Sequence, residues 1–530
     1  MKKITILFVI CMLALALIAS GSAVTQRKSM ATARAGTVQA PGVVGTPVAL
    51  PAGWSTPINI SKNSAESEGP YAVVDAKSNL YVCWVDWYGG VGARRDMMFN
   101  TNKTGKWGTA RSNQLGYTAI DDVGFPQVTV NQNGNSAIYA WMDGYFGGPE
   151  ARMAIQGEEL RNGVWGGLSL ISAAVSRPST YPTLSTSPLD NTVCFVWQQE
   201  VDRGFAVAYQ YLDGATGRMS DPDLIAEGQA GGQYLPNVFV DGKGKAHCVY
   251  ITRHLEAVVQ YASNSNPKNL KSWTAPVALT IGTGLDWSWP MVQASNDGDA
   301  YVVWQDDHAS LEAIYLKYQK NGVWQPTEQL TTTTLNPSAF PSIAVNPVTE
   351  DVYVTWTTLT GNGLGNIWLK TFETDKTLGK QVWSAPMQLT TSGRAGKSCI
   401  RVTKDPDIHI VYSENEEIWY VSKLAPRLTA IQPPTVASKI NRVLFSKEKS
   451  LTITFAKNPE NDDATLQEYR LYYKKAEEPD SAYSVLSTFA PTAALQVEMK
   501  KLAVSQKYTF MASVMNKDGL ELKTAAVTSD

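Results

Sequence analysis

The sequence predicts an all-β protein assembled from one repeated unit. Aromatic residues make up 10% of the 530 residues and include 16 Trp, and aromatic side chains favour strands. One phrase recurs: an aromatic residue with Pro, a short strand, a turn rich in Gly, Asn and Asp, and a second strand with an aromatic end. These strand-end aromatic residues recur at intervals of 52 to 57 residues. They are Trp84, Trp141, Trp197, Tyr250, Trp304, Trp356 and Tyr412.

Each repeat also has a recognisable start and a recognisable last strand. The entry pairs are Phe125-Pro126, Tyr181-Pro182, Leu235-Pro236, Trp289-Pro290 and Phe340-Pro341, with the reversed pair Pro70-Tyr71 in the first repeat. The fourth strands open at Trp107, Trp165, Met219, Trp273, Trp324 and Trp383. Four antiparallel strands at a period near 50 residues are typical of a β-propeller blade.

The seventh repeat ends after its third strand, at residues 418–422. The segment GWSTPINIS at 53–61 resembles VWSAPMQLT at 382–390, which opens a fourth strand, but no earlier strands precede it. We therefore expect 53–61 to supply the missing strand of the last blade, which would join the chain ends and leave no open sheet edge. The predicted fold is a seven-bladed β-propeller over 53–426.

The N-terminal segments have other compositions. Residues 1–23 contain two Lys, an apolar run and small residues near Ala23, which is typical of an export signal. Residues 24–52 are rich in Ala, Gly, Pro, Thr and Val and are expected to form a flexible tether. Because no second long apolar run follows, no membrane span is expected. We expect a bacterial protein that is secreted, periplasmic or held at the cell surface.

Four Cys follow the export signal, and their even number permits disulfides. They are Cys83, Cys194, Cys248 and Cys399. Each lies within an apolar strand of a different repeat. We therefore favour buried free thiols.

Composition and motifs exclude several function classes. The net charge of -2 and the pI of about 6.2 provide no basic surface for nucleic acid. No zinc spacing, Walker-type loop or Gly-x-Ser-x-Gly segment occurs. The turn at 296–299 resembles a calcium-loop fragment, but Asn-Asp-Gly between two strands favours a tight hairpin. No metal or other cofactor is expected.

One face of the propeller is the candidate functional surface. Loops after the second strands and loops entering the next blade emerge on this face, where side chains are free to serve function. Positions two residues after the strand-end aromatic mark it: Asp86, Asp143, Gln199, Thr252, Asp306, Thr358 and Glu414. These side chains are interpreted either as turn caps or as a carboxylate-lined mouth for a cation or polyol.

Blades four and five carry the densest set of reactive side chains. Blade four has Tyr234, Arg253 and His254, and blade five has Trp287, Asp306, Asp307 and His308. A His beside a carboxylate can act as a general base, Arg can hold an acidic group, and Trp can stack on a sugar ring. The predicted ligand-binding residues are Asp86, Asp143, Arg253, His254, Trp287, Asp306, Asp307 and His308. The candidate catalytic residues are His254, His308, Tyr234 and Arg253, while His247 and His409 lie within strands and are expected to be structural. Chance proximity of two surface histidines is the alternative.

The repeated phrase resembles the sialidase-type propeller superfamily with BNR-like repeats. That resemblance implies an arginine triad, a Tyr-Glu nucleophile pair, an Asp acid and turns of the form Ser-x-Asp-x-Gly-x-Thr-Trp. The corresponding turns at 102–107, 161–165 and 320–324 keep Gly and Trp but lack the Ser and Asp. Because the arginines are scattered, no member of the catalytic set is assigned to a residue here.

Residues 427–530 resemble a fibronectin type III domain. Leu502 and Tyr508 have the spacing of that family's tyrosine corner, and Phe455 stands where the family usually carries a core Trp. Three functions are open: an exported binding or scaffold protein for a glycan or protein, a polysaccharide-active lyase or glycosidase, and a structural part of an envelope assembly. We favour the first, as a monomer.

Overall fold

The computed structural model shows an all-β chain. It describes residues 50–51, 53–88, 94–113, 124–145, 152–167, 169–172, 177–226, 232–253, 256–282, 288–307, 311–332, 336–360, 363–375, 378, 380–425, 431–443, 446–459, 461, 466–516 and 521–530. Two 3₁₀ turns, Leu270–Ser272 and Asp480–Ala482, are the helical elements within these ranges. The chain divides into two compact units between Leu424 and Ala425.

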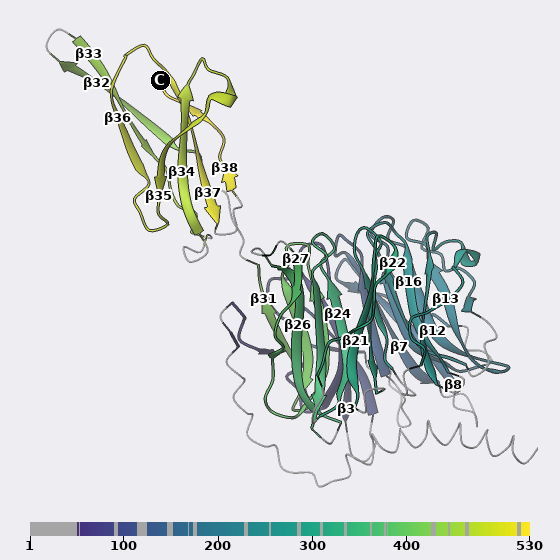
Figure 1. Cartoon of the computed structure of the whole chain (residues 1–530). Helices are drawn as coiled ribbons and strands as arrows, with labels where there is room; N and C mark the ends of the chain where they lie inside the picture. Colours follow the sequence, from purple (N-terminus) through teal and green to yellow (C-terminus); the bar gives the residue numbers. More distant parts are fainter. Residues whose placement is uncertain are drawn as a thin grey trace, which may run out of the picture. The chain divides into compact units, whose positions relative to one another are not determined.

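The first unit consists of antiparallel sheets that follow one another along the chain (Figure 1). The first sheet contains β2 (Glu66–Val74), β3 (Leu80–Tyr88), β4 (Arg94–Thr101) and β5 (Arg111–Asn113). The second contains β6 (Gly124–Val130), β7 (Ser136–Tyr145), β8 (Arg152–Arg161), β9 (Val164–Trp165) and β10 (Ser169–Leu170). The third contains β11 (Ser179–Thr186), β12 (Val193–Val201), β13 (Gly204–Leu212) and β14 (Asp223–Ala226).

The remaining sheets of this unit continue the pattern. The fourth contains β15 (Gln233–Val240), β16 (Ala246–Arg253), β17 (Ala257–Asn264) and β18 (Val277–Ala278). The fifth contains β19 (Met291–Ala294), β20 (Ala300–Asp306), β21 (Ala313–Lys320), β22 (Val323–Trp324) and β23 (Glu328–Gln329). Two further groups are β24 (Ser338–Val345), β25 (Val352–Leu359), β26 (Gly365–Asp375), β27 (Lys380–Trp383) and β28 (Met387–Gln388), and β29 (Ala395–Val402), β30 (Ile408–Glu414) and β31 (Glu417–Lys423). They join at the single pair Gly365 and Ala395.

The first strands of successive sheets form a closed ring. They contact one another in the order β2, β6, β11, β15, β19, β24 and β29, and β29 contacts β2 again. The strand-end aromatic residues are buried between the sheets, as expected for the core of such a ring. This arrangement is that of a β-propeller.

The N-terminal strand closes the last group of strands, as predicted. In β1 (Ile58–Asn59), Ile58 pairs with Tyr420 and Asn59 with Trp419 of β31. On either side of this pair, Ser55 N–H donates to Ser422 O at 2.7 Å and Ile60 N–H donates to Ile418 O at 2.8 Å. Two segments more than three hundred residues apart thus complete one sheet.

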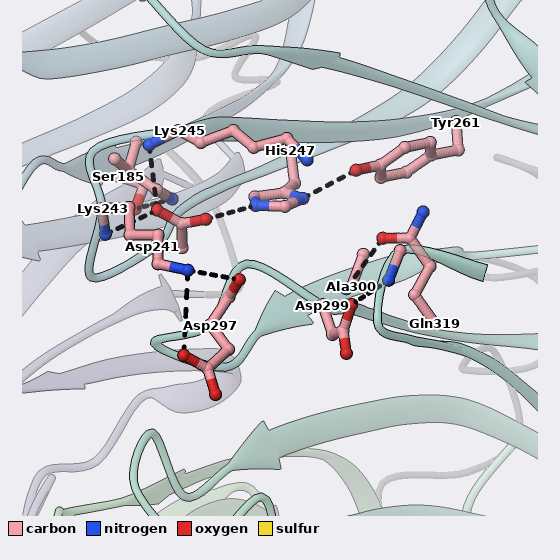
Figure 2. A network of polar contacts seen from close by, with 12 residues as sticks. Ser185, Asp241, Lys243, Lys245, His247, Tyr261, Asp297, Asp299, Ala300 and Gln319 are labelled. Carbon is pink, nitrogen blue, oxygen red and sulfur yellow. Dashed lines mark hydrogen bonds and ion pairs between the residues drawn. The ribbon is translucent and has the colours of Figure 1, made fainter. Parts of the chain in front are cut away.

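The turns between the first and second strands are held by side chains that accept backbone hydrogen bonds. In the fourth sheet, Asp241 Oδ1 accepts from the amides of Lys243 and Lys245 at 2.8 and 2.9 Å. Figure 2 shows His247 between Asp241 and Tyr261: its Nε2 lies 2.9 Å from Asp241 Oδ2 and its Nδ1 lies 2.8 Å from Tyr261 Oη. His409 contacts Tyr420 Oη in the same way at 2.9 Å. The interpretation of both histidines as structural is confirmed by their burial.

Two other expectations from the sequence are confirmed. Residues 296–299 connect β19 and β20, and the Asp299 carboxylate accepts from the amides of Asn321 and Gly322 at 2.7 Å each. Because β19 and β20 pair antiparallel, the turn at 296–299 is a hairpin, and the Asp299 carboxylate holds a different turn, the one between β21 and β22. The four cysteines of the described chain are buried free thiols: Cys83, Cys194, Cys248 and Cys399.

The second unit consists of two packed sheets. One has the order β32 (Thr435–Val443), β33 (Ser446–Thr454) and β36 (Gln496–Leu502). The other has the order β35 (Ser484–Phe489), β34 (Leu466–Lys475), β37 (Tyr508–Asn516) and β38 (Glu521–Lys523), with β39 (Val527–Thr528) also paired to β37. Phe455, Tyr469 and Phe510 are buried in the core between them.

Candidate ligand-binding site

The side chain two residues after each strand-end Trp accepts a hydrogen bond from that Trp. The indole Nε1–H groups donate as follows: Trp84 to Asp86 at 2.7 Å, Trp141 to Asp143 at 3.3 Å, Trp197 to Gln199 at 2.9 Å, Trp304 to Asp306 at 3.4 Å and Trp356 to Thr358 at 3.2 Å. A buried indole N–H needs such an acceptor. The Trp-x-Asp pattern in the sequence therefore reflects a hydrogen bond at the strand end, which Gln199 and Thr358 accept in two other sheets.

Asp86 shows how fully such a side chain is engaged. It is 0% exposed, and besides Trp84 it accepts hydrogen bonds from Ser67 Oγ at 2.6 Å and Asn63 Nδ2 at 2.5 Å. Burial raises the pKa of Asp86, and these donors oppose the shift. Asp143 and Asp306 are buried as well. The acidic residues that the sequence places on the functional face therefore serve first to hold the strand ends.

The residues that do turn toward the ring axis come from the entry pairs. The residue before each entry Pro has a left-handed backbone, with φ of 53° at Phe125, 52° at Tyr181, 51° at Leu235, 44° at Trp289 and 54° at Phe340. In β6, β11, β15 and β24 the pairing register shifts at this point. A bulge with a left-handed residue changes the direction of its side chain.

Side chains from the preceding sheet support these bulges. The residue directly after Trp304 is Gln305, whose Oε1 accepts from the Phe340 amide at 2.9 Å. Gln198 accepts from the Leu235 amide at 3.4 Å in the same way. The strand end that carries the buried Trp therefore also fixes the bulged residue of the next sheet.

Four of these aromatic rings lie close together, and three of them surround one lysine. Ring centroids lie 4.3 Å apart for Phe125 and Tyr181, 6.1 Å for Phe125 and Trp289, and 6.1 Å for Trp289 and Phe340. Lys397 of β29 places Nζ 4.4 Å from the Trp289 ring centroid, 5.2 Å from that of Phe340 and 5.5 Å from that of Phe125. We call Phe125, Tyr181, Trp289, Phe340 and Lys397 the axis cluster. All five are partly exposed.

Lys397 is the charged centre of the axis cluster. Burial lowers the pKa of its ammonium, and the carboxylate of Glu68 opposes this shift. Ring faces within about 6 Å of a cation also favour its charged form. The axis cluster therefore combines apolar ring faces, on which a sugar ring can stack, with one ammonium donor for an anionic group.

The end of the fourth sheet differs from those of the sheets that carry Trp at this position. Its strand-end residue is Tyr250 in place of Trp, and two residues later Thr252 pairs across the sheet with Gln233. Among the described residues, Tyr250 Oη, Thr252 Oγ1 and Gln233 Nε2 are buried without a hydrogen-bond partner. An ordered water molecule or another group outside the chain can satisfy buried polar atoms of this kind.

Two predicted catalytic residues, Tyr234 and Arg253, are the sequence neighbours of Gln233 and Thr252. Tyr234 packs against Phe205 with centroids 5.4 Å apart, and burial raises its pKa while the Arg253 charge opposes the shift. Arg253 is half-buried and its amide donates to Gly232 O at 3.1 Å. Asp307 is half-buried at the end of β20. The predicted residues His254, Trp287 and His308 lie outside the described residues.

Neither a metal site nor a membrane span is found in the described ranges. No group of three or more His, Cys, Asp or Glu side chains there is arranged to hold a metal ion. No described helix has the length and apolar character needed to cross a bilayer.

Sequence reasoning missed most of the axis cluster. The entry pairs indicate where strands begin, and the preference for a large ring before Pro in four of five pairs is the signal that could have indicated a shared role. Lys397 occupies the bulge between Ala395 and Ser398, where the seventh repeat has lost its entry pair. Alignment of the repeats at their bulges would have placed it with the rings.

Comparisons with known proteins give distant structural matches. No protein-family model and no curated protein sequence matches the chain. Among solved structures, the polysaccharide lyase Uly1 is 13% identical with a TM-score of 0.45, and the match covers 74% of this chain and 94% of the lyase. A PL25 ulvan lyase is 11% identical with a TM-score of 0.48, covering 69% and 95%. A leech intramolecular trans-sialidase is 8% identical with a TM-score of 0.40, covering 70% and 92%. At these scores the likeness carries no argument about activity.

Proposed function

We propose that this chain is an exported carbohydrate-binding protein that recognises an acidic glycan at the axis cluster. The observation that carries the proposal is the convergence of four rings and one ammonium from different sheets on the ring axis. Packing within a sheet does not require this arrangement. Four residues of the cluster, Phe125, Tyr181, Trp289 and Phe340, have left-handed backbone angles, and backbone strain of this kind is characteristic of functional sites.

The chemistry of the axis cluster fits a sugar with a carboxylate or sulfate. Trp289 offers the largest ring face, and stacking on such a face is a common way to bind the apolar side of a sugar ring. Three rings hold the Lys397 ammonium in position, so the site is preorganised for a ligand. An anionic group is the partner that satisfies this charge.

The proposed architecture is a seven-bladed propeller of sialidase type followed by a fibronectin type III-like domain. The ring order of the first strands and the pairing of β1 with β31 support the first part. The two sheets of the second unit, with Phe455 in the core and Tyr508 at the start of β37, support the second. Residues 1–23 would direct export, residues 24–52 would form a tether, and the secreted, periplasmic or surface-held protein would act as a monomer.

A polysaccharide-active enzyme is the second candidate. It is favoured by one observation, the unpartnered polar atoms of Gln233, Tyr250 and Thr252 next to Tyr234 and Arg253. In this interpretation Arg253 would hold an acidic group of the polysaccharide, and Tyr234, His254 or His308 would act as the general acid or base. Asp306, Asp307 and Trp287 would line the same ligand-binding surface.

A glycan array read by mass spectrometry separates the two candidates. The probe is the exported chain from residue 24 onward, applied to uronate-rich, sulfated, sialylated and neutral glycans. Retention that is lost in Trp289→Ala supports binding at the axis cluster. A lower-mass product that disappears in Tyr234→Phe supports the enzyme. Retention that both variants keep would contradict both sites.

A further inference from the structure

The hairpin of β32 and β33 extends beyond the rest of its sheet. The two strands pair from Thr435 with Thr454 to Val443 with Ser446, whereas the third strand β36 reaches only as far as Lys449, which pairs with Leu502. Figure 1 shows this hairpin projecting past the other strands of the second unit. We call residues 439–443 and 446–448 the ribbon. A two-stranded ribbon alone is only marginally stable in water.

One face of the ribbon continues the core face of the sheet. Leu451 is fully buried in the core, and two residues earlier Lys449 is 2% exposed because its Nζ donates to Gln506 O and Asp530 O at 2.8 Å each. Lys449 therefore closes the edge of the core. Directly opposite Lys449 on the same face is Ile440, which is 54% exposed.

This face also carries two cations directly opposite one another. Arg442 pairs across the ribbon with Lys447, and both side chains are exposed. Like charges at directly opposite positions destabilise a sheet. Within the described residues no ion pair joins either side chain to a carboxylate, and Lys439 adds a third exposed cation on the other face. Glu448 is the one acidic residue of the ribbon.

We propose that the ribbon docks on the surface of an anionic lipid bilayer. Arg442 and Lys447 supply charge complementarity to acidic headgroups, which would also relieve the repulsion between the paired cations. The exposed Ile440 favours an anionic bilayer over an acidic polymer as the partner. Only a bilayer has an apolar region, and burial of an aliphatic side chain there is favourable in free energy.

Vesicle sedimentation with the chain from residue 24 onward tests this proposal. The vesicles are phosphatidylcholine with or without phosphatidylglycerol. We expect binding to the anionic vesicles alone, a loss of about thirtyfold in the partition coefficient when Arg442→Gln and Lys447→Gln are combined, and a smaller loss for Ile440→Ser. The matched control combines Lys475→Gln with Lys507→Gln, which removes the same charge from exposed positions elsewhere in the second unit.

Three results would overturn the proposal. The first is no binding to anionic vesicles, and the second is an equal loss of binding in the control variant. The third is binding to an acidic polysaccharide, lost in the Arg442 and Lys447 variant, by a chain that does not bind the vesicles. Circular dichroism of each variant verifies that the second unit is folded. Because the ribbon and the axis cluster lie in different units, the Arg442 and Lys447 variant should keep any glycan binding. Failure of one proposal is therefore distinguishable from failure of the other.

Discussion

Replacement of Asp86 by Ala is the most informative change to the strand-end contacts. It removes the acceptor for three donors, Trp84 Nε1, Ser67 Oγ and Asn63 Nδ2, at 2.7, 2.6 and 2.5 Å. The first two donors stay buried without a partner, and each such group costs about 1–3 kcal/mol. Part of this cost is offset because a buried carboxylate no longer has to be desolvated, as the raised pKa of Asp86 indicates. We expect a net loss of about 2–4 kcal/mol in the free energy of unfolding of the ring.

Tryptophan fluorescence during urea unfolding measures this loss for the ring alone. All 16 Trp lie between residues 54 and 419, so the second unit does not contribute to the signal. Thr358→Ala is the matched control, because it removes one acceptor, 3.2 Å from Trp356 Nε1, at a half-buried position. Its expected cost is about 1 kcal/mol, the cost of one donor left without a partner. A cost below about 1 kcal/mol for Asp86→Ala would refute the view that these residues hold the strand ends.

Three further predictions concern the ring. Burial lowers the pKa of His247 below 6.5, with Asp241 opposing, so the unfolded chain binds this proton first and the ring should lose stability as pH falls below about 6.5. His247→Phe should remove part of that loss while costing stability at every pH; equal pH dependence in both chains would argue against it. Burial raises the pKa of Cys83, Cys194 and Cys248, so the native chain from residue 24 onward should react slowly with a thiol reagent at neutral pH. The unfolded chain should yield four reactive thiols, and a smaller number would reveal a disulfide. Deletion of residues 53–61 should lower the urea midpoint of the ring without changing the second unit, and an unchanged midpoint would mean that the pairing of β1 with β31 contributes little.

The repeat could be derived from the sequence because its cause is local. A strand-end Trp with an acceptor two residues later is fixed by contacts within one sheet, so each copy keeps its spacing. Ring closure was predictable for the same reason, since 53–61 carries the pattern of a fourth strand without its own sheet. The hairpin at 296–299 followed from the conformational needs of Asn, Asp and Gly.

The candidate site was less predictable because it forms between repeats. The left-handed backbone of Trp289 turns its ring toward the axis instead of into a sheet. The periodicity of the sequence does not encode that backbone angle. Lys397 lacks the entry-pair pattern altogether, so only its register in β29 places it among the rings. Conversely, Asp86 looked free for function because its partners Ser67 and Asn63 lie about 20 residues earlier in the sequence.

The central claim is that the axis cluster binds an acidic glycan, and titration of the chain with an oligogalacturonate tests it most directly. Isothermal titration calorimetry would compare the exported chain with Trp289→Ala, Lys397→Met and the control Trp383→Phe, which lies on the outer strand β27. The account predicts that Trp289→Ala and Lys397→Met each raise the dissociation constant about tenfold or more, as expected when a stacking or charged contact worth about 1.4 kcal/mol is lost, while Trp383→Phe leaves it unchanged. Binding of equal strength in all four proteins would contradict the claim.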